Sequence, residues 1–599
     1  MKKRSQVDIN ETWNLKDLFE DDESFYEEID QTLAISKNFR EKYQKIDSAD
    51  KLKSALKDLS SLSARLSRLG SFAGISTEVD ANDPHPQKRY ANYGKKASDI
   101  LANLSFFDNI LANLDKDLIN QVRDEMSDYD YFLKRALDKK EYILDESTEE
   151  ALSKLSPTFD APYNEYSSMR YGDIKVEEIN VEGENIPLNH NSFEEYYETD
   201  KNTEIRRKAF ENYHKALKKY ESSNGAIYNT HINNEKILAN LRGFDSVIDM
   251  LLSYQDIDRK IYDNHIDIIM EKLPQHMRKY ANILKKVYKL DEMTYADLKL
   301  SVDTGFSKEI EINEARDYII NGLSILGDDY VNMVKKAFDE RWIDYAQNEG
   351  KRTGAFCDTP YGVHSYIMTS YNKDISQVMT LAHELGHAGH FESSNKNQDF
   401  LNTDVSMYFV EAPSTANEIT MERYLLKNAK NDREKLWVLD TMISKTYYHN
   451  FVTHFLEAAF QREVYERIDE GQSLGAGDFN KIFNDKIKEF WGEDIKIVEG
   501  SELTWMRQPH YYMGLYPYTY SAGLSIGTKI SDKMVNGDKK DIKIWREVLS
   551  LGSTMGPIDL SQKAGVDMST TKPIEETIEF IGEIIDEIDR LCDKLGLYE

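Results

Sequence analysis

The sequence has little cysteine and no long apolar run. Its 599 residues include two cysteines, Cys357 and Cys592, which lie far apart. Such a pair gives no disulfide framework and is typical of a reducing compartment. No stretch of 18 apolar residues occurs, and the basic N-terminus has no apolar stretch behind it. We therefore expect a soluble, cytoplasmic protein without a transmembrane helix or a secretory signal.

Positive charge is also scarce. The 76 Lys and Arg residues are outnumbered by 106 Asp and Glu residues, which gives a formal net charge of −30. This excess argues against nucleic acid or an anionic membrane surface as a partner. The sequence is 40% hydrophobic and 30% charged, which is typical of a globular protein. Its length predicts two to four structural units.

Helical periodicity dominates the chain and predicts a mainly α fold. Residues 22 to 155 are almost wholly helical in pattern, with a helix start at Ser48 and a break at Asp80–Pro86. Pro573 opens a final helix with an isoleucine-rich apolar face. One leucine stripe recurs at intervals of three and four residues and is expected to be core. It consists of Leu52, Leu56, Leu59, Leu62, Leu66 and Leu69.

Four local patterns interrupt or punctuate the helices. Residues Tyr171–Leu188 partly alternate and predict a small β-hairpin. Ser192–Glu195 resembles a capping box within a long helix over residues 191–220. Leu298–Val302 is typical of a short alternating strand. Asn313 is a plausible N-cap for a helix that runs to about residue 326.

The strongest chemical signal is a His-Glu-x-x-His sequence, with histidines at His383 and His387. On a helix these residues are i and i+4, so both imidazoles project from one face and can hold a single zinc ion. Glu384 beside them can act as a base toward a water activated by that ion. Small and apolar flanking residues allow such a helix to be buried. The alternative is a surface helix with two incidental histidines.

A catalytic zinc needs a third protein ligand. His390 lies two turns from His383, about 10 Å along a straight helix, which is too far for one ion; it is expected at a cleft wall or as a buried histidine. Glu411, 24 residues beyond His387, is the better candidate, with a surface glutamate as the alternative. Glu418 shares its helix face and can accept a hydrogen bond from a ligand histidine.

Two flanking segments have possible roles in the same site. Val363–Tyr371 is β-rich and ends just before the histidine helix. Such a strand can pair its edge with an extended peptide, or it can be an ordinary strand of a small sheet. Cys357 precedes it in a turn-rich loop, and we interpret it as a small neutral side chain, not a nucleophile.

A third segment, Gln508–Gly523, combines a histidine with five tyrosines. Taken by itself, such a cluster is more often cleft lining or core than catalytic. Peptide hydrolysis at zinc does need hydrogen-bond donors for a developing oxyanion, and tyrosine O–H or histidine N–H groups can supply them.

The motifs together resemble a known family. His383–His387 combined with Phe409–Ser414 resembles the signature of the thimet oligopeptidase and oligoendopeptidase F metallopeptidases. Trp13–Phe19 resembles the opening of the oligoendopeptidase F branch, and the likeness extends over nearly the whole chain. It implies a mainly α, prolate, multi-helical body with a deep central channel and a small β-sheet beside the zinc helix. It also implies an N-terminal helical region at 1–110, an oligoendopeptidase F-type N-terminal domain with a small β-hairpin at 111–190, and a catalytic domain at 191–599.

The resemblance also implies roles for individual residues. One zinc per chain would be held by His383, His387 and Glu411, with Glu384 as general base; His390 is not a ligand in that family. The donors to the oxyanion would be His510 and Tyr520. The weaker candidates for substrate contact are Tyr512, Tyr516 and Tyr518.

These features predict a zinc-dependent endopeptidase that hydrolyses internal bonds of short, unfolded oligopeptides within a channel. Short peptides are the expected partners, without nucleic acid or membrane. One rival is an exopeptidase on a similar scaffold, in which Arg507 or Arg352 would hold the terminal carboxylate of the substrate. The other is a non-enzymatic peptide-binding or scaffold protein with a structural zinc, although such sites usually have four protein ligands and no adjacent base.

Overall fold

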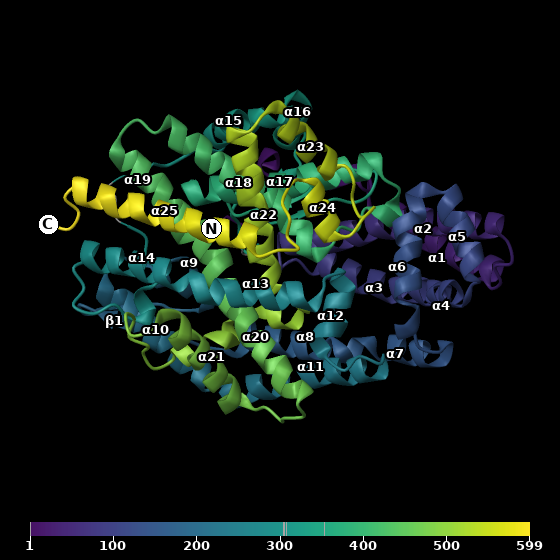
Figure 1. The fold of residues 1–599 in the computed structure, drawn as a ribbon, viewed down its shortest axis with the longest axis horizontal. Helices are drawn as coiled ribbons and strands as arrows, with labels where there is room; N and C mark the ends of the chain where they lie inside the picture. The colour runs from purple at the N-terminus through teal and green to yellow at the C-terminus, as the bar shows by residue number, and fades with distance from the viewer. Residues whose placement is uncertain (1, 303–305, 307, 353) are drawn as a thin grey trace. The chain divides into compact units, whose positions relative to one another are not determined.

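The computed structural model describes residues 2–302, 306, 308–352 and 354–599. The expected mainly α fold with small sheets is confirmed (Figure 1). The chain forms two compact units that interleave along the sequence. Unit 1 comprises Met1–Leu155, Lys308–Met421 and Ile530–Gly565; unit 2 comprises Ser156–Ser307, Glu422–Lys529 and Val566–Glu599. Across the described residues, each helix is too short or too polar to cross a membrane.

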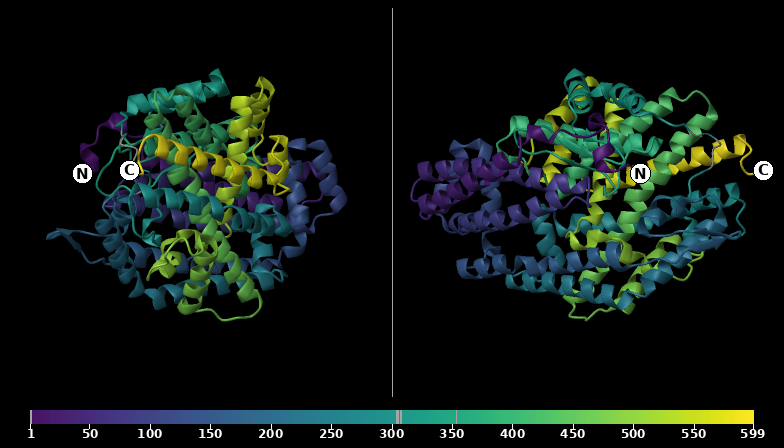
Figure 2. Two further views of the ribbon diagram at one scale, coloured as in Figure 1. Left: turned by 60° about the vertical axis from the view of Figure 1, so that its left-hand side comes forward. Right: turned by 180° about the vertical axis from the view of Figure 1, so that it is seen from behind.

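Unit 1 begins with a helical bundle. Helices α1 (Asp22–Tyr43), α2 (Ala49–Glu78) and α3 (Pro84–Leu104) pack side by side (Figures 1 and 2). Ser48 caps α2 as expected, because its hydroxyl accepts a hydrogen bond from the first turn. Asp83 caps α3 in the same way, so the predicted break between these helices is confirmed.

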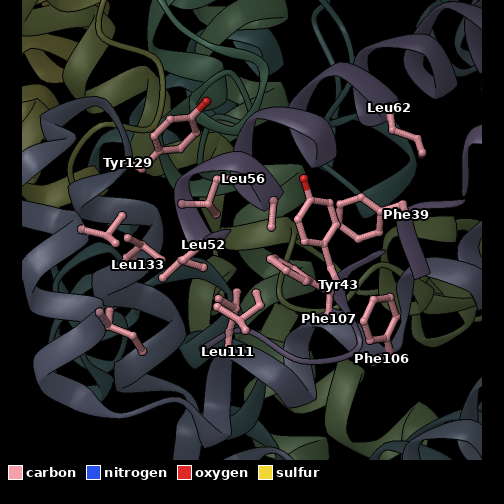
Figure 3. Close-up of a cluster of buried hydrophobic side chains, with 14 of the residues drawn as sticks. Phe39, Tyr43, Leu52, Leu56, Leu62, Phe106, Phe107, Leu111, Tyr129 and Leu133 are labelled. Atoms are coloured by element: carbon pink, nitrogen blue, oxygen red, sulfur yellow. The ribbon is translucent and has the colours of Figure 1, made fainter. Parts of the chain in front are cut away.

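The leucine stripe of α2 lies in the core of unit 1. Its partners come from α1 and from α4 (Phe106–Asn113), α5 (Lys116–Glu125) and α6 (Asp130–Asp138). Figure 3 shows Leu52 and Leu56 among these side chains. Leu52, Leu56, Leu62 and Leu69 are fully buried, and Leu59 and Leu66 pack partly buried at the edge. Burial of one such side chain contributes about 1.5–3 kcal/mol.

Unit 2 contains the predicted hairpin over a shorter span. Strand β1 (Ile179–Val181) pairs antiparallel with β2 (Glu184–Ile186). The turn places Glu182 and Gly183 at φ 52° and 88°, the left-handed pair that a tight two-residue turn requires. The earlier part of the expected hairpin is different, because Met169–Asp173 forms a π-helical turn.

The expected capping box is wrong by one turn. Asn189, not Ser192, caps helix α9 (His190–Glu195), and Ser192 occupies the third position of that helix. The helix also stops at residue 195, so the single long helix over 191–220 is wrong. Helix α10 follows separately at Thr203–Lys218.

Two further local predictions are wrong. Leu298–Val302 is not a strand, because its backbone finds other partners: the N–H of Val302 donates to the Asp440 carboxylate at 3.0 Å. Helix α15 (Ile312–Gly322) begins one residue before Asn313, and Glu311 occupies the N-cap position.

The final helix of unit 2 is as predicted. Helix α25 (Lys572–Lys594) has Pro573 in its first turn. It packs against α13 (Arg259–Lys272) and α14 (Pro274–Val287) (Figure 1). Its buried apolar face consists of Ile574, Ile578, Ile581, Ile584, Ile585, Ile588 and Leu591.

A small three-stranded sheet lies beside the histidine helix in unit 1. Its order is β3 (Ile343–Asp344), β5 (Tyr366–Met368) and β4 (Phe356–Asp358). Strand β5 is therefore central and pairs with a neighbour on each side. Of the two alternatives for Val363–Tyr371, the ordinary strand of a small sheet is confirmed over residues 366–368, which offer no free edge to a peptide. Burial raises the pKa of the Cys357 thiol in β4 well above its usual range, which agrees with a neutral cysteine.

A carboxyl group in the interior of unit 2 makes stability depend on pH. Glu235 of α11 (Glu221–Leu241) is 12% exposed and accepts a hydrogen bond from the Tyr465 hydroxyl. Burial raises its pKa to about 8. Because the unfolded carboxyl titrates near 4.5, the folded state binds more protons between these values. Stability is thus lost as the pH rises through this window.

We predict that Glu235→Gln removes this loss. At pH 9 the variant should be more stable than the wild type by up to a few kcal/mol, and the difference should shrink toward pH 5. Melting temperatures at both pH values test this, with the exposed residue Glu20, exchanged for Gln, as control. If the melting temperatures of wild type and Glu235→Gln changed equally between the two pH values, the raised pKa of Glu235 would be contradicted.

Candidate active site and its metal ligands

The two motif histidines lie on a buried helix. Helix α17 (Ile375–Asn397) is capped by Asp374, whose carboxylate accepts a hydrogen bond from the Ser376 N–H. His383 and His387 follow one turn apart, with ring centroids 5.0 Å apart. The small and apolar flanking residues are buried, as expected. The surface-helix alternative is therefore wrong.

A second helix approaches α17 at a glycine. Helix α18 spans Met407–Asn428 and carries Glu411 in its second turn. A Cβ atom on Gly386 would lie 2.5 Å from Ser414 Cα and 2.6 Å from the Pro413 carbonyl oxygen. Both are backbone atoms that cannot move aside, so only glycine permits this approach. The contact brings Glu411 to the histidine pair.

A second glycine and two polar side chains fix the same interface. A Cβ on Gly389 would lie 2.4 Å from the Tyr330 ring. The Tyr330 hydroxyl donates to the Leu385 carbonyl at 3.2 Å and accepts from Asn417 Nδ2 at 2.9 Å. Asn417 also donates to the Ala382 carbonyl at 3.2 Å. These bonds join the backbone of α17 to side chains of its neighbours, and sequence reasoning had missed them.

Glu411 lies at the distance from each histidine that one tetrahedral ion requires. Glu411 Oε2 lies 3.3 Å from His383 Nε2 and 3.4 Å from His387 Nε2. For zinc–ligand bonds of about 2.0–2.1 Å, the edge of a tetrahedron is about 3.3–3.4 Å. A two-histidine, one-carboxylate donor set also suits catalytic zinc. The three residues therefore fit the ion.

Further side chains hold the ligands in place. Glu418 Oε2 lies 3.2 Å from His383 Nδ1, the nitrogen that points away from Glu411. Ser414 donates its hydroxyl hydrogen to Glu411 Oε2 at 2.9 Å. Such partners orient ligand rings and carboxylates. Ser414 was not singled out in the sequence, although it lies one turn beyond Glu411.

The electrostatics of the cluster favour a cation. Burial alone would raise the pKa of Glu411, but the His387 and His383 rings outweigh it and hold that pKa well below its usual range. Burial raises the pKa of Glu384, whose Oε2 is buried without a hydrogen-bond partner among the described residues. A raised pKa suits a group that must accept and then return a proton.

His390 is separate from the ligand set. It is buried, and its ring meets the Phe409 ring edge-on at 6.1 Å. Burial, assisted by His387, lowers its pKa to about 3. The expected burial of His390 is confirmed.

In unit 2, three residues of the tyrosine-rich segment gather into one cluster. His510 lies in η14 (Pro509–Tyr512), and Tyr520 lies in α22 (Pro517–Asn536). The His510 ring centroid is 5.7 Å from that of Tyr516 and 5.6 Å from that of Tyr520. The two tyrosine rings are 4.8 Å apart.

The other two tyrosine candidates make different contacts. Tyr512 packs against Tyr166 of α8 (Ala161–Ser168) at 5.0 Å. Tyr518 is fully buried, and its hydroxyl donates to Gln255 Oε1 at 2.6 Å. Both side chains belong to the internal packing of unit 2.

Sequence reasoning missed a carboxylate beside His510. Glu457 of α20 (His454–Asp469) has its Oε2 atom 3.0 Å from His510 Nδ1. His454 contacts the other oxygen of the same carboxylate. The residues are 53 positions apart, so only the His454–Glu457 spacing within one helix turn could have hinted at the cluster.

A buried histidine pair with an adjacent glutamate and a third, helical glutamate ligand defines the class of zinc metallopeptidases. Comparison with known proteins identifies the family. Residues 196–580 match the model of peptidase family M3, and residues 111–175 match a model named Oligopeptidase F. The chain belongs to peptidase family M3 and is a metallopeptidase that hydrolyses oligopeptides.

Relatives and solved structures agree with this family. Oligopeptidase PepF of Bacillus subtilis is 27% identical over 99% of this chain and 89% of its own length. The chromosomal oligoendopeptidase F of Lactococcus lactis subsp. cremoris is 25% identical over 99% of both chains. The structure of oligoendopeptidase-F from Enterococcus faecium aligns with a TM-score of 0.74 at 20% identity, covering 96% of this chain and 99% of that one. The resemblance inferred from the motifs is confirmed.

We predict that Gly386→Ala separates α17 from α18. Overpacking of this kind typically costs about 1–3 kcal/mol, and zinc content should fall as Glu411 moves away. Gly94→Ala is the matched control, since that glycine is also inside a helix but has nothing within 4 Å. The control should be neutral or slightly stabilising. Melting temperature and bound zinc are measured; a Gly386→Ala protein with full zinc content would contradict the close-contact argument.

We predict that exchanging the metal ligand Glu411 weakens zinc binding more than exchanging its supporting neighbour Glu418. Glu411→Gln is expected to lose zinc during dialysis against a mild chelator. Glu418→Gln should retain the site with about 10- to 100-fold weaker affinity. Chelator competition followed by metal analysis distinguishes them. Equal affinities of wild type and Glu418→Gln would show that the 3.2 Å contact does not support His383.

Proposed function

We propose that the protein is an endopeptidase that cleaves internal bonds of short, unfolded peptides with one zinc ion per chain. The observation that carries this proposal is the His383–His387–Glu411 set with Glu384 beside it on the same helix. The names of the relatives, oligopeptidase and oligoendopeptidase F, support the same substrate class. A cytoplasmic location is consistent with the two free cysteines.

Zinc held by His383, His387 and Glu411 would acidify water and polarise the scissile carbonyl. Glu384 accepts a proton from the attacking water and returns it to the leaving amine, acting as general base and then general acid. Its burial suits this task, because a desolvated carboxylate is a stronger base than a hydrated one. Glu418 keeps His383 in the tautomer that leaves Nε2 free to bind metal.

His510 and Tyr520 are proposed to donate hydrogen bonds to the oxyanion that forms on the substrate carbonyl. Their shared cluster with Tyr516 supports this assignment. Tyr516 is the better candidate for substrate contact, whereas the packing of Tyr512 and Tyr518 disfavours them.

The exopeptidase alternative requires an arginine that is free to bind the terminal carboxylate of the substrate, and the structure disfavours both candidates. Arg507 would have to bind a substrate carboxylate, but its guanidinium is buried between two glutamates of its own unit. It lies 2.9 Å from Glu194 Oε1 and 2.8 Å from Glu198 Oε1. Arg352, the other candidate, pairs with Glu78 at 3.2 Å. A structural zinc is disfavoured by three ligands accompanied by a base.

Glu384→Gln tests the mechanism. We predict about one zinc per chain in both wild type and variant, with peptide cleavage reduced by at least ~10³-fold in the variant. Metal analysis and a fluorogenic peptide assay measure the two quantities. Cleavage at the wild-type rate with full zinc content would rule out Glu384 as the base.

A peptide blocked at both ends tests the position of cleavage. An endopeptidase should cut it at an internal bond, and mass spectrometry should identify two blocked fragments. An exopeptidase should leave it intact. The unblocked version of the same peptide serves as control for sequence preference.

A further inference from the structure

Four titratable side chains form a hydrogen-bonded chain in unit 2. Glu457 Oε2 lies 3.0 Å from His510 Nδ1, and Glu457 Oε1 lies 3.1 Å from His454 Nδ1. His454 Nε2 lies 2.9 Å from His449 Nε2. The side chains of Glu457 and His454 are 2% and 3% exposed, and that of His510 is 17% exposed. One buried carboxylate thus holds two imidazoles, one on each oxygen.

The hydrogen count fixes the tautomer of His510. A carboxylate can only accept hydrogen bonds, so both imidazoles must carry hydrogen on Nδ1. Burial alone would raise the pKa of Glu457, but His454 and His510 outweigh it and lower it to about 2. The carboxylate is therefore charged at neutral pH. His454 Nε2 then accepts from His449, which completes the chain.

The tautomer decides what His510 can do. With hydrogen on Nδ1, the Nε2 atom of a neutral ring is a bare acceptor. Nε2 can donate to an oxyanion only when the ring is an imidazolium. The imidazolium keeps its Nδ1–H bond to Glu457, so the ring orientation is the same in both protonation states. Glu457 therefore fixes the ring orientation that His510 needs in order to donate a hydrogen bond to an oxyanion.

The geometry is that of hydrogen bonds, although the three side chains also lie close enough to hold an ion. In the zinc site, one oxygen of Glu411 lies 3.3 and 3.4 Å from two Nε2 atoms. In this cluster each imidazole faces a different oxygen, at 3.0–3.1 Å. That separation lies in the usual range of an N–H···O hydrogen bond. The remaining nitrogen of His454 is also engaged.

Other groups around the Glu457–His510 pair do not replace this bond. Lys299 and Arg507 line a small cavity with Glu457. The Lys299 ammonium donates to a threonine hydroxyl at 2.8 Å, and Arg507 is paired with its two glutamates. Tyr516 and Tyr520 contact the His510 ring from the side of α22. Of these groups, only Glu457 is an anion hydrogen-bonded to the ring.

We propose that Glu457 is a positioning residue that fixes the tautomer and orientation of His510, so that Nε2 faces the oxyanion and donates to it when the ring carries both hydrogens. This inference rests on the proposed role of His510 and extends it. On the buried side, His454 binds the other oxygen of the Glu457 carboxylate, and His449 binds His454.

The experiment is a double-mutant cycle read as a pH profile. Rates of peptide cleavage are measured from pH 5.5 to 9 for wild type, Glu457→Gln, His510→Gln and the double variant. Glu457→Gln should lower kcat/KM about 10- to 100-fold, mainly through kcat. In the His510→Gln background, Glu457→Gln should have no further effect.

Control measurements separate positioning from folding. Glu235→Gln makes the same exchange at another buried glutamate of unit 2 and should leave kcat/KM unchanged at pH 7. If Glu457→Gln does not fold, Glu457→Asp takes its place. Its shorter side chain lengthens the bond to His510, so kcat/KM should fall in the wild-type background and stay unchanged in the His510→Gln background.

Three results would overturn the proposal. They are a wild-type rate and pH profile for the folded Glu457 variant, additive losses in the double variant, and a second equivalent of bound zinc that disappears in Glu457→Gln. A His510→Gln enzyme with nearly full activity would instead remove the proposed role of His510. That outcome is distinguishable, because in the first case His510→Gln is impaired while the Glu457 variant is not.

Discussion

The close approach of α17 and α18 at Gly386 is the constraint on which the metal site depends. Two helix backbones touch where a Cβ would lie 2.5 Å from Ser414 Cα. This contact places one oxygen of Glu411 within 3.4 Å of both histidines. The bonds of Tyr330 and Asn417 to carbonyls of α17 secure the same spacing. The packing of the α17 and α18 backbones thus sets the distances between the three ligand residues.

The charge distribution of the site suits a bound cation. Glu384, Glu411 and Glu418 lie close to two histidines, and Glu384 and Glu411 are buried. Several carboxylates removed from water are costly unless a positive charge compensates them. Burial would lower the pKa of His383, yet bonds to Glu411 and Glu418 raise it well above its usual range. The same charge can be supplied by a divalent ion, and metal binding would then release that proton.

Several sequence patterns were reliable where neighbours along the chain decide the structure. The leucine stripe of α2, the helix start at Ser48, the break at Asp80–Pro86 and the final helix depend on periodicity and local hydrogen bonds. Other patterns failed where a residue far away in the chain binds the segment. Alternation at Leu298–Val302 predicted a strand, but Asp440 binds its backbone from 138 residues away. For residues 363–371, one alternative was a strand with a free edge, but β3 and β4 pair with both sides of β5.

The sequence by itself determined the His383–Glu384–His387 arrangement, because an i, i+4 spacing on a helix fixes relative side-chain positions through local geometry alone. It also indicated Glu411, through a second motif whose connection to the first came from family resemblance. Only the tertiary structure decided that Gly386 must lack a side chain, that Tyr512 and Tyr518 serve packing, and that Glu457 holds His510. These depend on contacts between residues far apart in the chain, whose distances no local pattern encodes.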